Sequence, residues 1–169
     1  LRAQGWKLRA EVLRQRSRGL TGARVSLLPH QLAIASKIAG RERPRALLAD
    51  EVGLGKTIEA GLIFAALRAL GRADRVLVLT PYSLVHQWLV ELYRRFHALF
   101  TVAHAEVPPA GEPDEPEPRP RVQANDDPFA TASRMIAPIS WLLEPGRLEQ
   151  ALARDWDLVI VDEAHHLAW

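Results

Sequence analysis

The run Ala-Leu-Leu-Ala-Asp-Glu-Val-Gly-Leu-Gly-Lys-Thr-Ile-Glu, residues 46–59, decides the fold that we expect. Leu47-Leu48-Ala49 predicts a short buried strand, and a helix is predicted from Ile58 to Leu70. Between them, Gly53 and Gly55 permit backbone angles and close approaches that a side chain would obstruct. A strand, a glycine-bearing turn and a helix in this order predict a loop whose backbone N–H groups bind phosphate.

The end of this run carries the side chains that a phosphate loop needs. Lys56 is expected to reach the β- and γ-phosphates of a nucleotide, and the Thr57 hydroxyl to ligate Mg²⁺. The usual pattern is G-x-x-x-x-G-K-[ST], and Asp50 replaces its first glycine. By itself the tripeptide Gly-Lys-Thr is a weak signal, and a plain strand–turn–helix is the better interpretation.

A second motif strengthens the nucleotide hypothesis. The strand predicted over Asp157 to Val161 delivers Asp162 and Glu163 to its C-terminal end, where doubly wound sheets bind ligands. Asp162 is expected to hold Mg²⁺, and Glu163 to orient and deprotonate the attacking water. Two alternatives are open: the acids start a helix, or His165 and His166 ligate a metal. Together the two motifs predict a Mg-ATP site.

The remaining apolar runs alternate between strand and helix. Strands are predicted at Val76–Leu79 and Arg134–Ala137, and helices at Leu84–Phe96 and from Trp141. Apolar spacing over residues 27–38, with Pro29 near the first turn, predicts another helix. This order predicts an α/β fold with a doubly wound, mostly parallel sheet.

Composition separates three regions of the 169 residues. Residues 1–24 hold seven of the basic side chains and one acid, so we expect a basic arm or linker that either meets nucleic acid or is a solvated connector. Residues 25–169 are expected to form one domain, with a Pro- and acid-rich surface loop at 105–128. The absence of cysteine excludes disulfides and thiolate metal sites, and no apolar run is long enough to span a bilayer. We expect a cytoplasmic protein.

These motifs resemble the Swi/Snf family of superfamily-two, double-stranded-DNA-translocating ATPases. The resemblance implies a RecA-like first lobe, in which the phosphate loop reads Asp-Glu-x-Gly-Leu-Gly-Lys-Thr, so that Asp50 is the expected residue. It also implies that ATP contacts a set of residues along the chain. These are Gln31, which would read adenine, and Asp50, Glu51, Gly53, Leu54, Gly55, Lys56, Thr57 and Asp162.

Other segments carry the rest of the resemblance. Thr80-Pro81 with His86-Gln87-Trp88 is similar to the family motif that lines the DNA track, and Asp162-Glu163-Ala164-His165 is similar to its second ATPase motif. Ile-Ser-Trp-Leu-Leu, residues 139–143, departs from the expected DNA-contact segment. Ser140 either caps a helix toward a DNA phosphate or has no DNA role, since Trp141 and Leu142 look like core residues. Arg94 and Arg95 either add charge near the track or form a solvated helix face.

A narrower resemblance, through residues 27–35, 48–61, 86–91 and 156–169, is to bacterial members that associate with RNA polymerase. It implies double-stranded DNA and RNA polymerase as partners, and a nucleoid-associated location. Related bacterial defence ATPases share much of the sequence of these segments. Since family members complete the site with a second lobe, we expect an incomplete first lobe that binds Mg-ATP with negligible turnover. The alternative is a non-catalytic, nucleotide-dependent interaction module.

Overall fold

A four-stranded parallel sheet forms the centre of the protein. The computed structural model describes residues 28–49, 55–103 and 127–166. In spatial order the strands are β2 (Thr101–Val102), β3 (Arg134–Pro138), β1 (Val76–Thr80) and β4 (Leu158–Val161). All three pairings are parallel. The carboxyl ends of β1, β3 and β4 therefore meet at one edge of the sheet.

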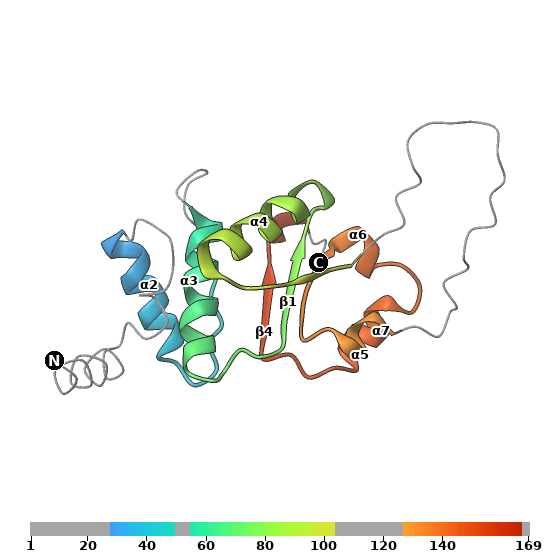
Figure 1. Cartoon of the computed structure of the whole chain (residues 1–169), viewed down its shortest axis with the longest axis horizontal. Coiled ribbons are helices and arrows are strands. Elements are labelled where there is room, and N and C mark those ends of the chain that lie inside the picture. The colour runs from blue at the N-terminus through green and yellow to red at the C-terminus, as the bar shows by residue number, and fades with distance from the viewer. Residues whose placement is uncertain (1–27, 50–54, 104–126, 167–169) are drawn as a thin grey trace, which may run out of the picture.

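Helices flank the sheet (Figure 1). In the chain, α2 (Pro29–Ala39) and α3 (Lys56–Ala69) precede β1, and α4 (Val85–Phe96) follows it. The shorter α5 (Pro128–Thr131), α6 (Ile139–Leu142) and α7 (Arg147–Leu152) lie together at the other end of the molecule. Two 3-10 turns, Tyr82–Leu84 and Ala164–His166, follow the carboxyl ends of β1 and β4.

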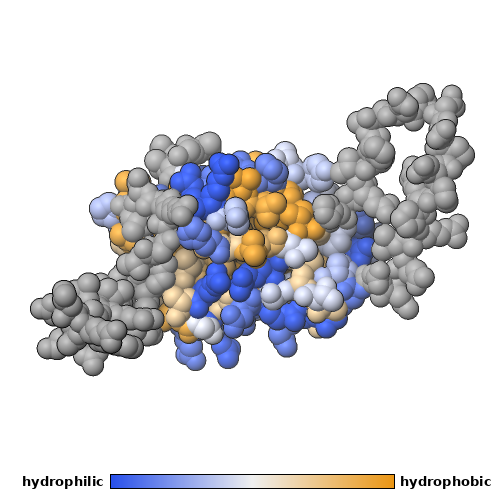
Figure 2. All heavy atoms as spheres, viewed as in Figure 1, coloured by the Kyte–Doolittle hydropathy of each residue, from blue (hydrophilic) through white to orange (hydrophobic). Residues whose placement is uncertain are grey.

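Strand alternation divides the apolar side chains between two cores. Successive side chains of a strand point to opposite faces of the sheet. Val76 and Val78 accordingly belong to a core shared with α3 and α4, whereas Leu77 belongs to a second core built around Phe129 and Trp141. Figure 2 shows hydrophobic residues gathered near the middle of one face, above a rim of hydrophilic ones. β1 and β3 are thus covered on both faces, as in other parallel sheets. No residue of β4 is fully buried, and Val159 is 47% exposed.

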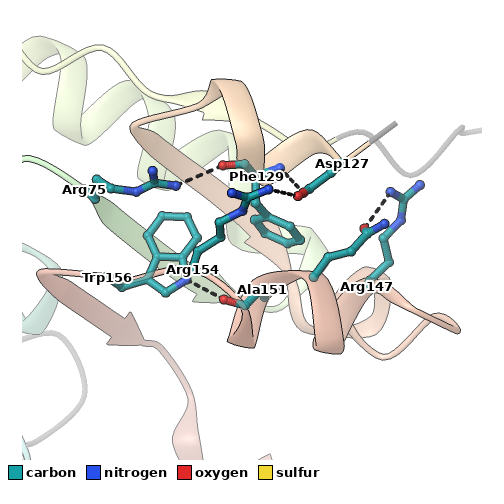
Figure 3. A network of polar contacts seen from close by, with 8 residues as sticks. Arg75, Asp127, Phe129, Arg147, Ala151, Arg154 and Trp156 are labelled. Atoms are coloured by element: carbon teal, nitrogen blue, oxygen red, sulfur yellow. Dashed lines mark hydrogen bonds and ion pairs between the residues drawn. The ribbon is translucent and has the colours of Figure 1, made fainter. Parts of the chain in front are cut away.

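Polar contacts fasten the second core (Figure 3). Asp127 accepts a hydrogen bond from the Phe129 backbone N–H at 2.9 Å, which caps α5, and forms an ion pair with Arg154. The indole N–H of Trp156 donates to the Ala151 carbonyl at 2.9 Å, and a guanidinium nitrogen of Arg75 donates to the Phe129 carbonyl at 3.0 Å. The network joins α5, α7 and the strands at their N-terminal ends.

The predicted α/β class and its mostly parallel, RecA-like sheet are confirmed. The strands at β1, β3 and β4 and the helices at α2, α3 and α4 are present within two residues of the predicted bounds. The helix predicted from Trp141 begins earlier, at Ile139, and ends after four residues. Trp141 and Leu142 are buried in the second core.

Two local predictions are wrong. Residues 44–49 have no regular secondary structure, and Leu47, predicted in a buried strand, is 81% exposed. Its apolar run is only three residues long, which offers few ladder hydrogen bonds to hold a strand. Asp127 and Pro128, predicted in the surface loop, instead open α5, because an aspartate cap followed by proline is a favoured helix start.

The basic arm (residues 1–24) and the rest of the predicted loop, residues 105–126, lie outside the described residues. No helix in the described part of the chain is long and apolar enough to cross a membrane.

Candidate functional site

A cleft of about 550 Å³ opens beside β4, between α3 and residues 44–49. Apolar residues of α3 and β4 line its floor, among them Ile63, Leu158 and Ile160. Its charged and polar lining comes from the start of α3 and from the carboxyl end of β4. These residues are Lys56, Thr57, Asp162, Glu163 and His165, and Arg45 adds a further charge from residues 44–49. The cleft therefore brings two segments about a hundred residues apart into one site.

The start of α3 points at this cleft. Gly55 precedes the helix with φ of 86°, in the left-handed region that glycine adopts readily. The helical hydrogen bonds of α3 begin with the Glu59 N–H, which donates to the Gly55 carbonyl at 3.0 Å. The N–H groups before it have no carbonyl within the helix to bind, and they carry the positive end of the helix dipole. Lys56 and Thr57 occupy this turn, so that an anion is favoured there.

Asp162 is held from two directions. The indole Nε1–H of Trp88 donates to Asp162 Oδ2 at 2.7 Å, and the backbone N–H of Glu163 donates to Oδ1 at 2.9 Å. The Asp162 N–H continues the ladder by donating to the Leu79 carbonyl at 2.8 Å. Trp88 is only 2% exposed, so that its indole needs an acceptor within the protein. The carboxylate of Asp162 thus has a fixed orientation at the mouth of the cleft.

Glu163 adopts a left-handed backbone conformation, with φ of 50°, which is uncommon for a residue with a Cβ. Such backbone strain is concentrated at functional sites. Its carboxylate lies 3.1 Å from His165 Nδ1 and is partly exposed to the cleft. The 3-10 turn Ala164–His166 follows Glu163 directly.

Gln31, near the start of α2, adjoins the start of α3. Its side chain is 2% exposed, and its Nε2 lies 3.1 Å from the point where a Cβ on Gly55 would stand. Arg72, just after α3, binds the C-terminal end of α2 by donating to the carbonyls of Ala39 at 2.8 Å and Arg41 at 2.7 Å. This clamp ties the C-terminal end of α2 to the end of α3.

The predicted site residues fall into three groups. Lys56, Thr57, Asp162 and Glu163 line one cleft, while Gln31 and Gly55 lie against each other beside it. The predicted residues Asp50, Glu51, Gly53 and Leu54 lie outside the described residues. The sequence prediction missed two features of the cleft, Arg45 in its lining and the Trp88–Asp162 bond. The signal for that bond was a tryptophan in an apolar helix face, because a buried indole requires an acceptor.

A second polar surface follows the carboxyl ends of β1 and β3. Thr80 and Pro138, the last residues of these strands, are register partners. The exposed Ser83 and Ser140 follow them closely in the chain and therefore lie at the same edge of the sheet. His86 and Gln87 are exposed in the first turn of α4.

Arg94 and Arg95 occupy the last turn of α4, about 12 Å along the helix axis from its first turn. Arg95 is also paired with Glu91. These positions favour the solvated-face interpretation for both arginines.

Residues 14–168 match the family described as SNF2-related domain. The chain is 50% identical over 153 residues to the RNA polymerase-associated protein RapA of Actinobacillus pleuropneumoniae serotype 5b, covering 90% of this chain and 16% of that protein. It is 46% identical over 170 residues to RapA of Vibrio vulnificus, covering 100% of this chain and 16% of that protein. The chain thus spans about a sixth of the length of these relatives.

The fold is also similar to that of a solved structure, the Sulfolobus solfataricus SWI2/SNF2 ATPase core in complex with dsDNA. The TM-score is 0.62 at 23% identity, covering 85% of this chain and 27% of the other. That likeness supports the RecA-like arrangement of the sheet. Because the family match extends over nearly all of the sequence, this chain belongs to the SNF2-related domain family.

Proposed function

We propose that this chain is the Mg-ATP-binding lobe of a Swi/Snf-type, double-stranded-DNA-translocating ATPase. The observation that carries the proposal is the convergence of Lys56 and Thr57 with Asp162 and Glu163 in one cleft. A cation and a helix start on one wall suit phosphate, and two carboxylates on the other suit a hydrated metal ion. The 550 Å³ volume is in the range of small-molecule sites.

Each residue has a separate task in this proposal. Lys56 would neutralise charge on the terminal phosphates, and the N–H groups that begin α3 would hold their oxygens. Thr57 and Asp162 would hold Mg²⁺, which would supply charge neutralisation across the β- and γ-phosphates. Glu163 would accept the proton of the attacking water. Gln31 would contact the adenine from α2.

The donor set fits this assignment. Oxygen ligands from a hydroxyl and a carboxylate are those that Mg²⁺ prefers, and it normally keeps several waters. Glycine at position 55 also fits a phosphate site, because its backbone can approach a ligand closely. A Cβ at this position would lie 3.1 Å from Nε2 of Gln31. The Glu163 carboxylate is partly exposed to the cleft, where water can reach it.

We assign DNA to the polar edge formed by the carboxyl ends of β1 and β3, where Ser83, His86 and Ser140 are exposed. Contacts from hydroxyls and amides follow the phosphate backbone without reading bases. The 50% identity to RapA supports RNA polymerase as the partner of the whole protein, and with it a cytoplasmic, nucleoid-associated location. Hydrolysis by these 169 residues alone is expected to be negligible, because an arginine from a second lobe is typically worth 10³–10⁵ in rate.

The test is calorimetric titration of the purified chain with Mg-ATP. Lys56→Ala should weaken binding at least about tenfold, since a charge-assisted contact to phosphate is lost. Lys37→Ala is the matched control, because Lys37 is exposed in the last turn of α2 and does not line the cleft. Equal affinities for the two variants, or no Mg-ATP binding by the unaltered chain, would contradict the assignment.

A further inference from the structure

We infer that Trp88 is a positioning residue for Asp162 and links the proposed DNA-facing edge to the proposed metal carboxylate. The inference rests on the proposed function of the cleft. In it, Trp88 acts on the bound metal through Asp162. Its observation is the 2.7 Å bond from Trp88 Nε1–H to Asp162 Oδ2. The bond joins α4 to the residue after β4 across the wall of the cleft.

The bond completes a two-point hold on the carboxylate. Oδ2 receives the indole N–H, and Oδ1 receives the backbone N–H of Glu163 at 2.9 Å. Each carboxylate oxygen accepts more than one hydrogen bond, so that both oxygens keep a lone pair for a metal-bound water. Outer groups of this kind orient the ligands of a metal and tune its affinity. Trp88, which also lines the cleft, therefore sets the direction of Asp162.

The position of Trp88 in α4 supplies the link to the polar edge. It lies in the first turn of the helix, directly after His86 and Gln87, which are exposed, whereas Trp88 itself is buried. The helix in turn follows the 3-10 turn Tyr82–Leu84 at the end of β1. A helical turn moves as a unit, because its backbone hydrogen bonds fix the residues relative to one another. A ligand that displaces this turn would thus also displace the donor to Asp162.

Another tryptophan shows what a purely structural indole bond looks like here. Trp156 donates its indole N–H to the Ala151 carbonyl at 2.9 Å, and its ring contacts Phe129 and Arg75 in the second core. It does not line the cleft. Trp88 and Trp156 therefore form a matched pair, each losing one indole hydrogen bond when replaced by phenylalanine. They differ in that the acceptor of Trp88 is a carboxylate of the proposed site, whereas the acceptor of Trp156 is a backbone carbonyl away from the cleft.

The experiment measures the ATP affinity of the full 169-residue chain with Mg²⁺ and with EDTA. The ratio of the two affinities is the increment due to the metal, and it is compared between the unaltered chain and its variants. Trp88→Phe should reduce that increment about tenfold and leave the metal-free affinity unchanged, the size expected when an outer-shell partner is removed. In an Asp162→Asn background the same substitution should cause no further loss. Trp156→Phe should keep the full increment.

The outcomes separate this inference from the proposed function. If the unaltered chain binds Mg-ATP but Trp88→Phe keeps its metal increment, or loses affinity equally with and without Mg²⁺, the positioning role is wrong. If the unaltered chain does not bind Mg-ATP, the proposed function itself fails.

Should Trp88→Phe not fold, the indole N–H resonances of the unaltered chain and of Asp162→Asn supply a second measurement. One tryptophan resonance has to shift between them, and an unchanged set would also overturn the inference.

Discussion

The side-chain nitrogen of Gln31 lies 3.1 Å from the point at which a Cβ on Gly55 would stand. Gly55 is therefore constrained twice, by its φ of 86° and by the buried amide against it. The relationship ties α2 to the start of α3, where the phosphates of a nucleotide are expected. A side chain at position 55 would disturb the proposed adenine contact and the phosphate contact together.

Gly55→Ala tests this relationship against a matched glycine. Gly71 also has a left-handed backbone, with φ of 68°, but a Cβ there would meet nothing within 4 Å. Both substitutions should lower the free energy of unfolding by about 1–2 kcal/mol, the cost of left-handed backbone for a residue with a Cβ. Only Gly55→Ala should also weaken Mg-ATP binding, by more than about tenfold. Equal binding by the two variants, measured by calorimetry, would argue against the crowding at Gly55.

The clamp by Arg72 gives a second prediction. Arg72→Met removes donors to the carbonyls at the end of α2, so that the free energy of unfolding should fall by about 1–3 kcal/mol. Amide hydrogen exchange should rise in α2 more than in α4. Arg68→Met is the control, because Arg68 is exposed in the last turn of α3 and makes no recorded side-chain hydrogen bond to a described residue. Unchanged exchange in α2 would mean that the clamp contributes little.

Much of the fold was predictable because its elements repeat simple patterns. Val76–Leu79 is an uninterrupted apolar run, as expected of a strand covered on both faces, and the helix after Gly55 is rich in apolar residues that are buried, among them Leu62, Phe64 and Leu67. The two-residue strand Thr101–Val102 was not predicted, since so short an element leaves no periodicity. The short helix at Pro128 was missed for another reason: the surrounding proline-rich composition concealed its Asp-Pro start.

The candidate site was predictable residue by residue but not contact by contact. Motif spacing identified Lys56, Thr57, Asp162 and Glu163, because the topology of a parallel sheet brings such residues to one edge. Motif spacing does not reveal which partner orients a carboxylate. Trp88 was assigned to the DNA track by resemblance, and its bond to Asp162 depends on how α4 packs on the sheet.

Close packing between α3 and α4 gives a third prediction. A Cβ on Gly61 would stand 2.3 Å from Cε2 of the Phe96 ring, which is itself buried. Gly61→Ala should therefore lower the free energy of unfolding by about 1–3 kcal/mol through overpacking. Adding Phe96→Leu makes room for the new methyl group, so that the double variant should lose less stability than the sum of the two single losses. Additive losses in denaturant unfolding would show that the ring moves aside freely.

The last prediction concerns the dependence of stability on pH. The hydrogen bond from Arg154 holds the pKa of Asp127 below its ordinary value of 3.8, and the backbone N–H of Phe129 adds to this effect. Because the pKa is lower in the folded chain, the stabilisation is complete above the unfolded pKa and is lost as the pH falls through the folded one. Because Asn caps a helix as well as Asp does, Asp127→Asn should reduce the free energy of unfolding at pH 7 only by the lost ion pair with Arg154, about 0.2–1 kcal/mol.

Urea unfolding at pH 7 and at successively lower pH values would measure this effect. The difference between the unaltered chain and Asp127→Asn should shrink as the pH falls below about 4, because protonation removes the same carboxylate charge. Arg154→Met should likewise reduce the loss of unfolding free energy at acid pH. The double variant should be little less stable than either single variant, since the two residues share one interaction. A difference that stays constant with pH would show that the charge of Asp127 does not account for the lost stability.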